Sequence, residues 1–177
     1  EQIEKIMHSS NLFWVEPQIK LAKMICENSF GDKVFFCNSG TEANETAIKI
    51  ARKYGLSKYG SERYEIISMV NSFHGRTLGA LAATGQPKYH KSFLPMVPGF
   101  KYAKFNDFDD LMANIDEKVC AIILEPVQGE GGIAPVDKEY IKKVRDICNE
   151  RDIILIFDEV QCGIGRTGTL FTYEQLG

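Results

Sequence analysis

Four short, mainly apolar runs recur along the chain, and they constrain its fold more than any other feature. Their apolar residues are continuous rather than alternating, which is typical of strands buried on both faces. Segments with helical spacing lie between them, and strands that alternate with helices predict an α/β fold of three layers, with a mostly parallel sheet between flanking helices. Between 71 and 104, frequent glycines and prolines predict only a short helix and loops. The predicted strands are 33–37, 65–70, 119–124 and 153–157, and the predicted helices are 16–27, 42–54 and 138–150.

The composition favours a small molecule or another protein as the partner of this chain. Its 177 residues carry 21 basic and 24 acidic side chains, a net charge of −3, without the basic cluster that binds nucleic acid or an anionic membrane. No apolar stretch approaches the roughly 20 residues needed to cross a bilayer, and the first residues lack the features of a signal peptide. The length is sufficient for one compact domain.

The cysteines indicate a reducing compartment. Their number is odd, they are widely spaced, and most lie in apolar segments where a thiol behaves as a small hydrophobic group. We therefore expect a cytoplasmic protein with neither a disulfide framework nor a zinc or other metal site. The five residues are Cys26, Cys37, Cys120, Cys148 and Cys162.

Polar residues follow each predicted strand, in the segments 38–42, 71–76, 125–132 and 158–161. In open parallel sheets, ligands bind outside the carboxyl ends of the strands. The fold prediction therefore places these four segments together at one edge of the sheet, where a binding site is expected.

The first of these segments begins a predicted helix. Gly40 permits close approach of the backbone, Thr41 offers a hydroxyl group, and the amides at a helix start favour an anion such as a phosphate. The residues from Ser39 to Glu42 also match the S-x-x-E capping box, which merely starts a helix. The residues alone leave both interpretations open.

The second and third segments carry groups that suit a planar ligand with carboxylates. Phe73 can stack on a ring, and Arg76 can bind a carboxylate through two hydrogen bonds, although a core aromatic and a surface charge would look the same. Glu125 ends a wholly apolar strand and precedes a glycine-rich loop that contains Glu130. Glu125 faces either a polar cleft or the solvent beyond the strand.

The fourth segment begins with Asp158, which follows the last predicted strand. A carboxylate at this position can hold a metal, a guanidinium or a protonated ring nitrogen. The residues 163–168 match the dinucleotide motif G-x-G-x-x-G, but the residues after them predict turns or extended chain rather than the required helix. A nicotinamide-dependent enzyme is thus the least favoured alternative, and the absence of a P-loop motif argues against a nucleotide hydrolase.

Four segments in this order identify a family: NSGTEANETAIKIARKYG at 38–55, SFHGRTLGALAATGQPKYH at 72–90, ILEPVQGEGG at 123–132 and IFDEVQCGIGRTG at 156–168. Together they resemble the class III, pyridoxal-phosphate-dependent aminotransferases, and the resemblance extends over essentially all 177 residues. The segments NLFWVEPQIKLAK and GQPKYHKSFLPMVPGF resemble the branch that acts on acetylated ornithine.

The resemblance implies a site for pyridoxal 5′-phosphate on the large domain of a fold type I enzyme. Asp158 would bond to the pyridine nitrogen and keep it protonated, so that the ring acts as an electron sink. Glycine and threonine at the helix start would hold the phosphate, an aromatic and a valine would contact the two ring faces, and a glutamine would contact the phenolic oxygen. The implied cofactor contacts are Gly40, Thr41, Phe73, Asp158, Val160 and Gln161.

The resemblance also implies the substrates. Arg76 would bind the substrate carboxylate, while Glu125 and Glu130 would lie on the substrate side of the cofactor. The implied reaction transfers the terminal amino group of N2-acetylornithine to 2-oxoglutarate, a step of arginine biosynthesis, in a homodimer. Ornithine or another ω-amino acid remains an alternative donor.

One family feature is missing from the sequence. Class III enzymes hold the cofactor as a Schiff base on a lysine, and no lysine follows Asp158 here. We therefore expect residues 1–177 to be part of a large cofactor-binding domain, without the lysine and the small carboxy-terminal domain. A non-catalytic module that retains the scaffold is the alternative.

Overall fold

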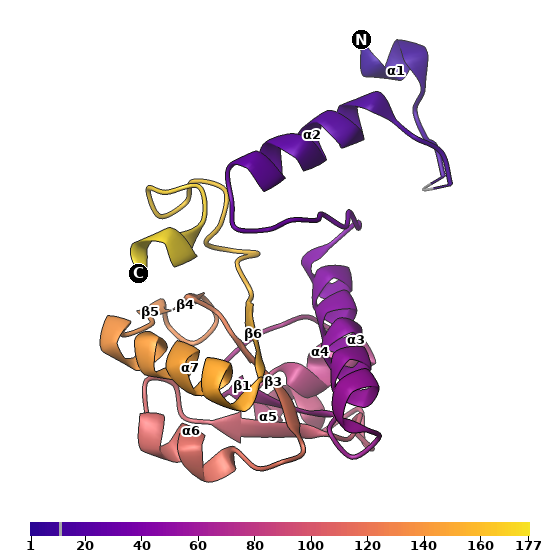
Figure 1. The fold of residues 1–177 in the computed structure, drawn as a ribbon. Coiled ribbons are helices and arrows are strands. Elements are labelled where there is room, and N and C mark those ends of the chain that lie inside the picture. The colour runs from indigo at the N-terminus through magenta and orange to yellow at the C-terminus, as the bar shows by residue number, and fades with distance from the viewer. Residues whose placement is uncertain (11) are drawn as a thin grey trace. The chain divides into compact units, whose positions relative to one another are not determined.

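A computed structural model describes residues 1–10 and 12–177, and the chain divides into two compact units, 1–36 and 37–177 (Figure 1). The first unit contains helix α1, Gln2–Lys5, and helix α2, Glu16–Glu27. Helix α2 has the predicted bounds, and its second residue is Pro17, which is well suited to the first turn of a helix. Neither helix contains a buried residue.

The second unit is built on a four-stranded parallel sheet, as predicted. Its strands are β1, Glu65–Met69; β2, Phe100–Ala103; β3, Val119–Leu124; and β6, Ile154–Phe157, in the order β2-β1-β3-β6. Neighbouring strands are parallel throughout. The central strand β3 is buried along its whole length, which explains its continuous apolar sequence.

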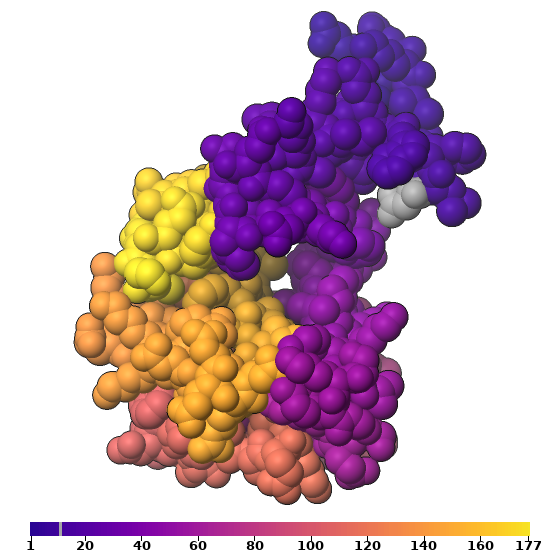
Figure 2. Space-filling view, in the orientation of Figure 1, coloured from indigo at the N-terminus to yellow at the C-terminus, as the bar shows by residue number. Residues whose placement is uncertain are grey.

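Helices cover both faces of this sheet and complete three layers (Figure 1). Helix α3, Gly40–Tyr59, and helix α4, Leu78–Ala83, bury Ile48, Ala51 and Ala83 against one face. Helix α6, Phe108–Asn114, and helix α7, Lys138–Arg151, bury Leu111 and Val144 against the other face. Figure 2 shows the orange surface of α7 in continuous contact with the salmon surface of α6.

Side-chain caps explain where α6 and α7 begin. Asp107 accepts a hydrogen bond from the Asp110 amide at the start of α6, and Asp137 accepts one from the Tyr140 amide at the start of α7. The remaining elements are short: helix α5, Pro87–His90; the antiparallel strands β4, Val127–Gln128, and β5, Ala134–Pro135; and a 3₁₀ turn, Thr172–Gln175.

Two strand predictions are wrong. Residues 33–37 form no strand, and Phe35 is 63% exposed. An apolar run becomes a strand only when a neighbouring strand pairs with its backbone, and composition does not reveal that neighbour. Conversely, β2 lies in the stretch predicted as helix and loops, because Lys101 interrupts its short apolar sequence and prolines and a glycine precede it.

The glycine motif at 163–168 lies in a series of turns with no helix directly after it, as expected. This excludes the local structure that dinucleotide binding requires. In the described part of the chain, no helix is long and apolar enough to span a bilayer. The five cysteines are free thiols.

The packing of α3 on the sheet generates a prediction for Gly55. In an isolated helix, Gly→Ala stabilises by about 1 kcal/mol. Here a Cβ at Gly55 would collide with the carbonyl oxygen of Arg63 and lie 3.0 Å from Cys120 Cβ. We therefore expect Gly55→Ala to lower the free energy of unfolding by about 1–3 kcal/mol in chemical denaturation.

Gly129→Ala is the matched control, because no heavy atom lies within 4 Å of a Cβ at Gly129. Its unfolding free energy should stay within about 0.5 kcal/mol of the parent value. An unchanged or increased stability of Gly55→Ala would contradict this account of how α3 packs.

Candidate functional site

A cavity of about 470 Å³ lies at the carboxyl edge of the sheet in the second unit. Its walls come from the segments that follow β1, β3 and β6 and from the first turns of α3. This is the edge at which ligands bind in open parallel sheets. The lining residues are Ser39, Gly40, Thr41, Asn44, Phe73, His74, Gly75, Glu125, Val127, Gly129, Glu130, Asp158, Val160 and Gln161.

The start of α3 forms one wall, and side-chain hydrogen bonds cap it. Ser39 Oγ accepts a hydrogen bond from the Glu42 amide at 3.3 Å, and Glu42 Oε2 accepts one from the Asn38 amide at 2.6 Å. These contacts leave the first two helical residues, Gly40 and Thr41, at the cavity. Their amides have no acceptor within the helix, so the Ser39 cap and an anion site are compatible.

Close approach of the backbone explains the glycine at the helix start. A Cβ at Gly40 would lie 2.7 Å from both Val160 methyl carbons. Glycine at this position therefore allows α3 and the segment after β6 to line the same cavity. Gly75 has a positive φ of 130°, and a Cβ there would collide with the Thr41 hydroxyl.

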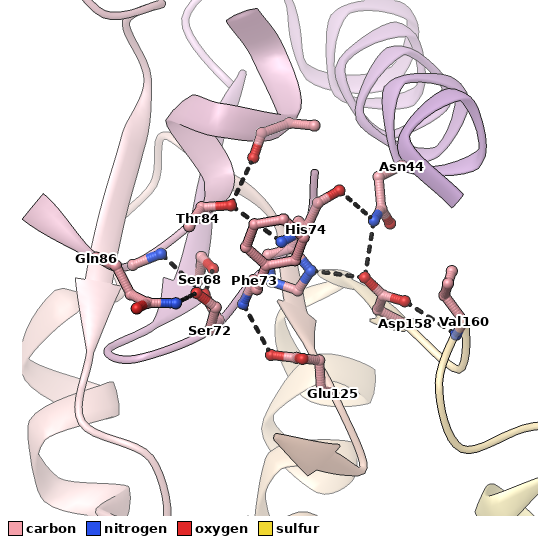
Figure 3. Close-up of polar contacts among 12 residues, drawn as sticks. Asn44, Ser68, Ser72, Phe73, His74, Thr84, Gln86, Glu125, Asp158 and Val160 are labelled. Atoms are coloured by element: carbon pink, nitrogen blue, oxygen red, sulfur yellow. Dashed lines mark hydrogen bonds and ion pairs between the residues drawn. The ribbon is translucent and has the colours of Figure 1, made fainter. Parts of the chain in front are cut away.

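Asp158 is 7% exposed in the cavity wall, and its carboxylate has three hydrogen-bond donors (Figure 3). Its Oδ2 lies 2.8 Å from His74 Nδ1 and 2.7 Å from Asn44 Nδ2, while Oδ1 accepts the Val160 amide at 3.1 Å. Burial alone would raise the pKa of Asp158, but the hydrogen bond and charge of His74 and the hydrogen bond of Asn44 outweigh it and lower the pKa. The carboxylate is therefore ionised at neutral pH.

Buried hydrogen bonds hold the turn that carries Phe73. Ser72 Oγ lies 3.1 Å from Ser68 Oγ and accepts the Gly85 amide at 2.9 Å. The His74 amide donates to Thr84 Oγ1 at 3.0 Å. Figure 3 shows these contacts on the side of His74 away from Asp158. The phenyl ring of Phe73 is thereby placed at the cavity by a rigid backbone.

A carboxylate from α3 holds the residues that follow this turn. Glu45 Oε1 accepts hydrogen bonds from Thr77 Oγ1 at 2.5 Å and from the amides of Gly79 and Ala80 at 3.0 and 3.1 Å. It supplies the start of α4 with the side-chain cap that Thr77 does not provide. A Cβ at Gly79 would lie 2.7 Å from the Glu45 carboxylate oxygens, so this contact depends on glycine.

Glu125 is the second buried acid of the cavity. Its side chain is 6% exposed, and its Oε2 accepts the Phe73 amide at 3.1 Å. Burial raises the pKa of Glu125 to about 7, and the nearby Asp158 charge adds to the increase, whereas His74 opposes it. The sequence left two positions for the Glu125 side chain, a polar cleft or the solvent, and in the structure it lines the cleft.

The structure brings together most of the residues singled out in the sequence. The cavity lining includes Gly40, Thr41, Phe73, Glu125, Glu130, Asp158, Val160 and Gln161. Arg76 is exposed and is not among the lining residues.

Sequence reasoning gave no role to two polar lining residues, Asn44 and His74. A signal for Asn44 was available, because it shares the buried face of α3 with Ile48, Ala51 and Gly55 at helical spacing. A polar residue on an apolar stripe is buried with partners. No pattern distinguishes His74, since its contact with Asp158 joins residues from separate strand ends.

Comparison with known proteins gives a family for this site. The family described as Aminotransferase class-III matches residues 1–177. The chain belongs to the class III aminotransferases. Enzymes of this family depend on pyridoxal phosphate.

Curated relatives of this class III chain include acetylornithine aminotransferases. It is 62% identical over 177 residues to the acetylornithine aminotransferase of Caldanaerobacter subterraneus subsp. tengcongensis and 58% identical over 177 residues to that of Methanocaldococcus jannaschii. Both alignments cover all of this chain but only 45% and 44% of the relative. The chain thus spans less than half the length of these proteins.

Solved structures of transaminases share the fold. An (S)-enantioselective ω-transaminase from Thermomicrobium roseum matches with a TM-score of 0.93 at 36% identity, covering 99% of this chain and 45% of that one. N-acetylornithine aminotransferase from Stenotrophomonas maltophilia matches with a TM-score of 0.82 at 38% identity, covering 98% and 43%.

The buried Glu125 generates a prediction about pH. Its pKa is about 7 in the native state and about 4.5 when the chain is unfolded. Between these values the native state retains a proton that the unfolded state releases, so the free energy of unfolding falls as pH rises. We expect Glu125→Gln to remove a fall of about 3 kcal/mol between pH 4.5 and 7.

Denaturation of the apo protein at several pH values measures this difference. Glu130→Gln is the control, because Glu130 lines the same cavity but is exposed. It should keep the pH dependence of the parent. Equal slopes for Glu125→Gln and the parent protein would show that Glu125 is ionised in the native state.

Proposed function

We propose that this chain forms most of the cofactor site of a pyridoxal-phosphate-dependent aminotransferase that transfers the terminal amino group of N2-acetylornithine to 2-oxoglutarate. The observation that carries the proposal is the buried, ionised Asp158 carboxylate in the same cavity as the start of α3. A carboxylate and a helix start present opposite electrostatic character to one ligand. Pyridoxal phosphate has a basic ring nitrogen and an anionic phosphate and is complementary to both.

The other lining residues fit the same cofactor. Gly40 and Thr41, at the free amides of α3, would hold the phosphate. Phe73 and Val160 supply apolar surfaces for the ring, and Gln161 supplies an amide for its phenolic oxygen. When bound, the cofactor supplies an electron sink for the carbanion of an amino acid substrate. The chain's own residues bind it, orient it and control one proton.

That proton is held at the ring nitrogen by Asp158. A lowered pKa keeps the carboxylate charged at neutral pH, and an ionised partner favours the protonated form of the nitrogen. Because Asp158 is buried, this interaction is weakly screened by solvent. The hydrogen bonds from His74 and Asn44 prevent the carboxylate from rotating away.

Acidic and basic groups for the substrate surround the cofactor residues. Glu125 is poised to exchange a proton near neutral pH, and Glu130 lies in the glycine-rich loop at the same cavity. Arg76 lies two residues after His74, where an exposed guanidinium can bind a substrate carboxylate. Arg76 is not among the lining residues, so its contact would be made with a part of the substrate that extends beyond the cavity.

Sequence identity supports N2-acetylornithine as the amino donor. Identity to acetylornithine aminotransferases reaches 62%, compared with 36% for the ω-transaminase of similar fold. Ornithine and other ω-amino acids are the second candidates, because the ω-transaminase structure matches this chain with a TM-score of 0.93. We further propose a cytoplasmic homodimer. The free cysteines are compatible with a reducing compartment.

The test uses the protein at the full length of its relatives, since the chain covers 45% of them. After addition of pyridoxal phosphate and removal of the unbound cofactor, the protein should retain visible absorption that is shifted from that of the free cofactor, and turnover of N2-acetylornithine with 2-oxoglutarate should exceed turnover of ornithine. Cofactor binding without turnover of any amino donor would instead support a non-catalytic module. Failure to bind the cofactor would contradict the proposal.

Asp158→Asn tests the central carboxylate in that enzyme. A neutral amide cannot keep the ring nitrogen protonated, so kcat should fall by at least about a hundredfold while cofactor binding remains. Steady-state kinetics and absorption spectra measure the two effects. Near-normal turnover would remove Asp158 from this role.

Arg76→Lys tests the carboxylate contact. One ammonium group cannot reproduce the two-pronged hydrogen bonding of a guanidinium, so KM for the carboxylate substrate should rise about tenfold or more with a smaller change in kcat. Arg166→Lys, at another exposed arginine, is the control and should leave both constants unchanged. An unchanged KM in Arg76→Lys would show that Arg76 does not bind the substrate carboxylate.

A further inference from the structure

We propose that Asn44 is a positioning residue, whose amide locks the Asp158 carboxylate and the Phe73 turn to the helix that would hold the cofactor phosphate. This inference rests on the proposed function and adds a residue to it. Asn44 lies on α3, lines the cavity and is 5% exposed.

Both hydrogens of the Asn44 amide are used. Nδ2 donates to Asp158 Oδ2 at 2.7 Å and to the carbonyl oxygen of His74 at 2.8 Å (Figure 3). A primary amide has two donors, so this one group satisfies two acceptors from different elements. Asn44 therefore joins α3, the segment after β1 and the segment after β6.

The helix transmits this contact to the phosphate end of the cavity. Asn44 follows Gly40 by four residues, which is about one turn on the same face of α3. The same helix meets the Phe73 turn a second time, because Gly75 lies against the Thr41 hydroxyl with no space for a Cβ. A shift of the helix start would thus displace the turn and the carboxylate together.

An uncharged donor is the suitable group for this position. Asp158 accepts three hydrogen bonds, from Asn44, His74 and the Val160 amide, which leaves one of its about four lone-pair sites for a ligand. Asn44 adds a hydrogen bond to the charged form without introducing a charge of its own. An acid there would place a second carboxylate against Asp158, in a region that also contains His74 and Glu125.

The experiment compares Asn44→Asp, Asn44→Ser and a control in the full-length, cofactor-loaded enzyme. Asn44→Asp replaces the donor with an acid of the same shape, whereas Asn44→Ser retains one donor and is the milder change. Thr46→Val is the control, because Thr46 lies on the same helix and its hydroxyl bonds only the Glu42 carbonyl. The quantities to be measured are the cofactor dissociation constant, the pH dependence of the bound cofactor's absorption, kcat, KM and the melting temperature.

Asn44→Asp should lower kcat about tenfold or more, leave KM for the amino donor within about threefold, and shift the pH dependence of the absorption by about one unit or more, since one unit corresponds to a tenfold change in proton affinity. Asn44→Ser should give smaller changes in the same direction. Thr46→Val should resemble the parent in every measurement.

Two results would overturn the inference while leaving the proposed function intact. One is a loaded Asn44→Asp enzyme with parental kcat and an unchanged spectral pH dependence. The other is a lower melting temperature in both Asn44 variants with no change in kcat or in the absorption spectrum of the bound cofactor. That result is expected of a purely structural residue. Failure of the parent enzyme to bind pyridoxal phosphate would overturn the proposed function and this inference with it.

Discussion

The buried negative charge of Asp158 is the interaction on which the candidate site depends. An isolated carboxylate in a protein interior costs far more free energy than a small domain can supply, so it must be hydrogen-bonded or protonated. Here His74, Asn44 and the Val160 amide keep it ionised. These donors come from α3 and from the segments after β1 and β6. Stabilising the charge therefore requires these three elements to keep their relative positions.

Glycines let these elements pack closely enough for this arrangement. Gly40 lets α3 approach Val160, and Gly79 lets α4 begin against the Glu45 carboxylate. At each position a side chain would occupy the space of an atom that lines or supports the cavity. Gly40 and Gly79 therefore serve close packing of the elements around the cavity, whereas Gly129 and Gly132 have open space around a Cβ.

The layered fold and most of the site were predictable, because both depend on local patterns. Continuous apolar runs predicted the buried strands, and residues at the carboxyl ends of parallel strands must meet at one edge of the sheet. The run at 33–37 misled because it pairs with no strand in the described part of the chain, and β2 was missed because its sequence, FKYA, contains a lysine and no continuous apolar run. Arg76 remains outside the cavity lining despite its position in the second polar segment.

By itself, the sequence determined the α/β layering, the strand ends at which polar groups gather and the family, since these follow from periodicity and from ordered motifs. Only the tertiary structure decided the state of the acids. Asp158 and Glu125 both follow apolar strands, yet the first has three donors and a lowered pKa, whereas burial raises the pKa of the second to about 7. Protonation depends on which side chains approach across the fold, and Asn44 and His74 reach Asp158 from residues that are distant in the chain.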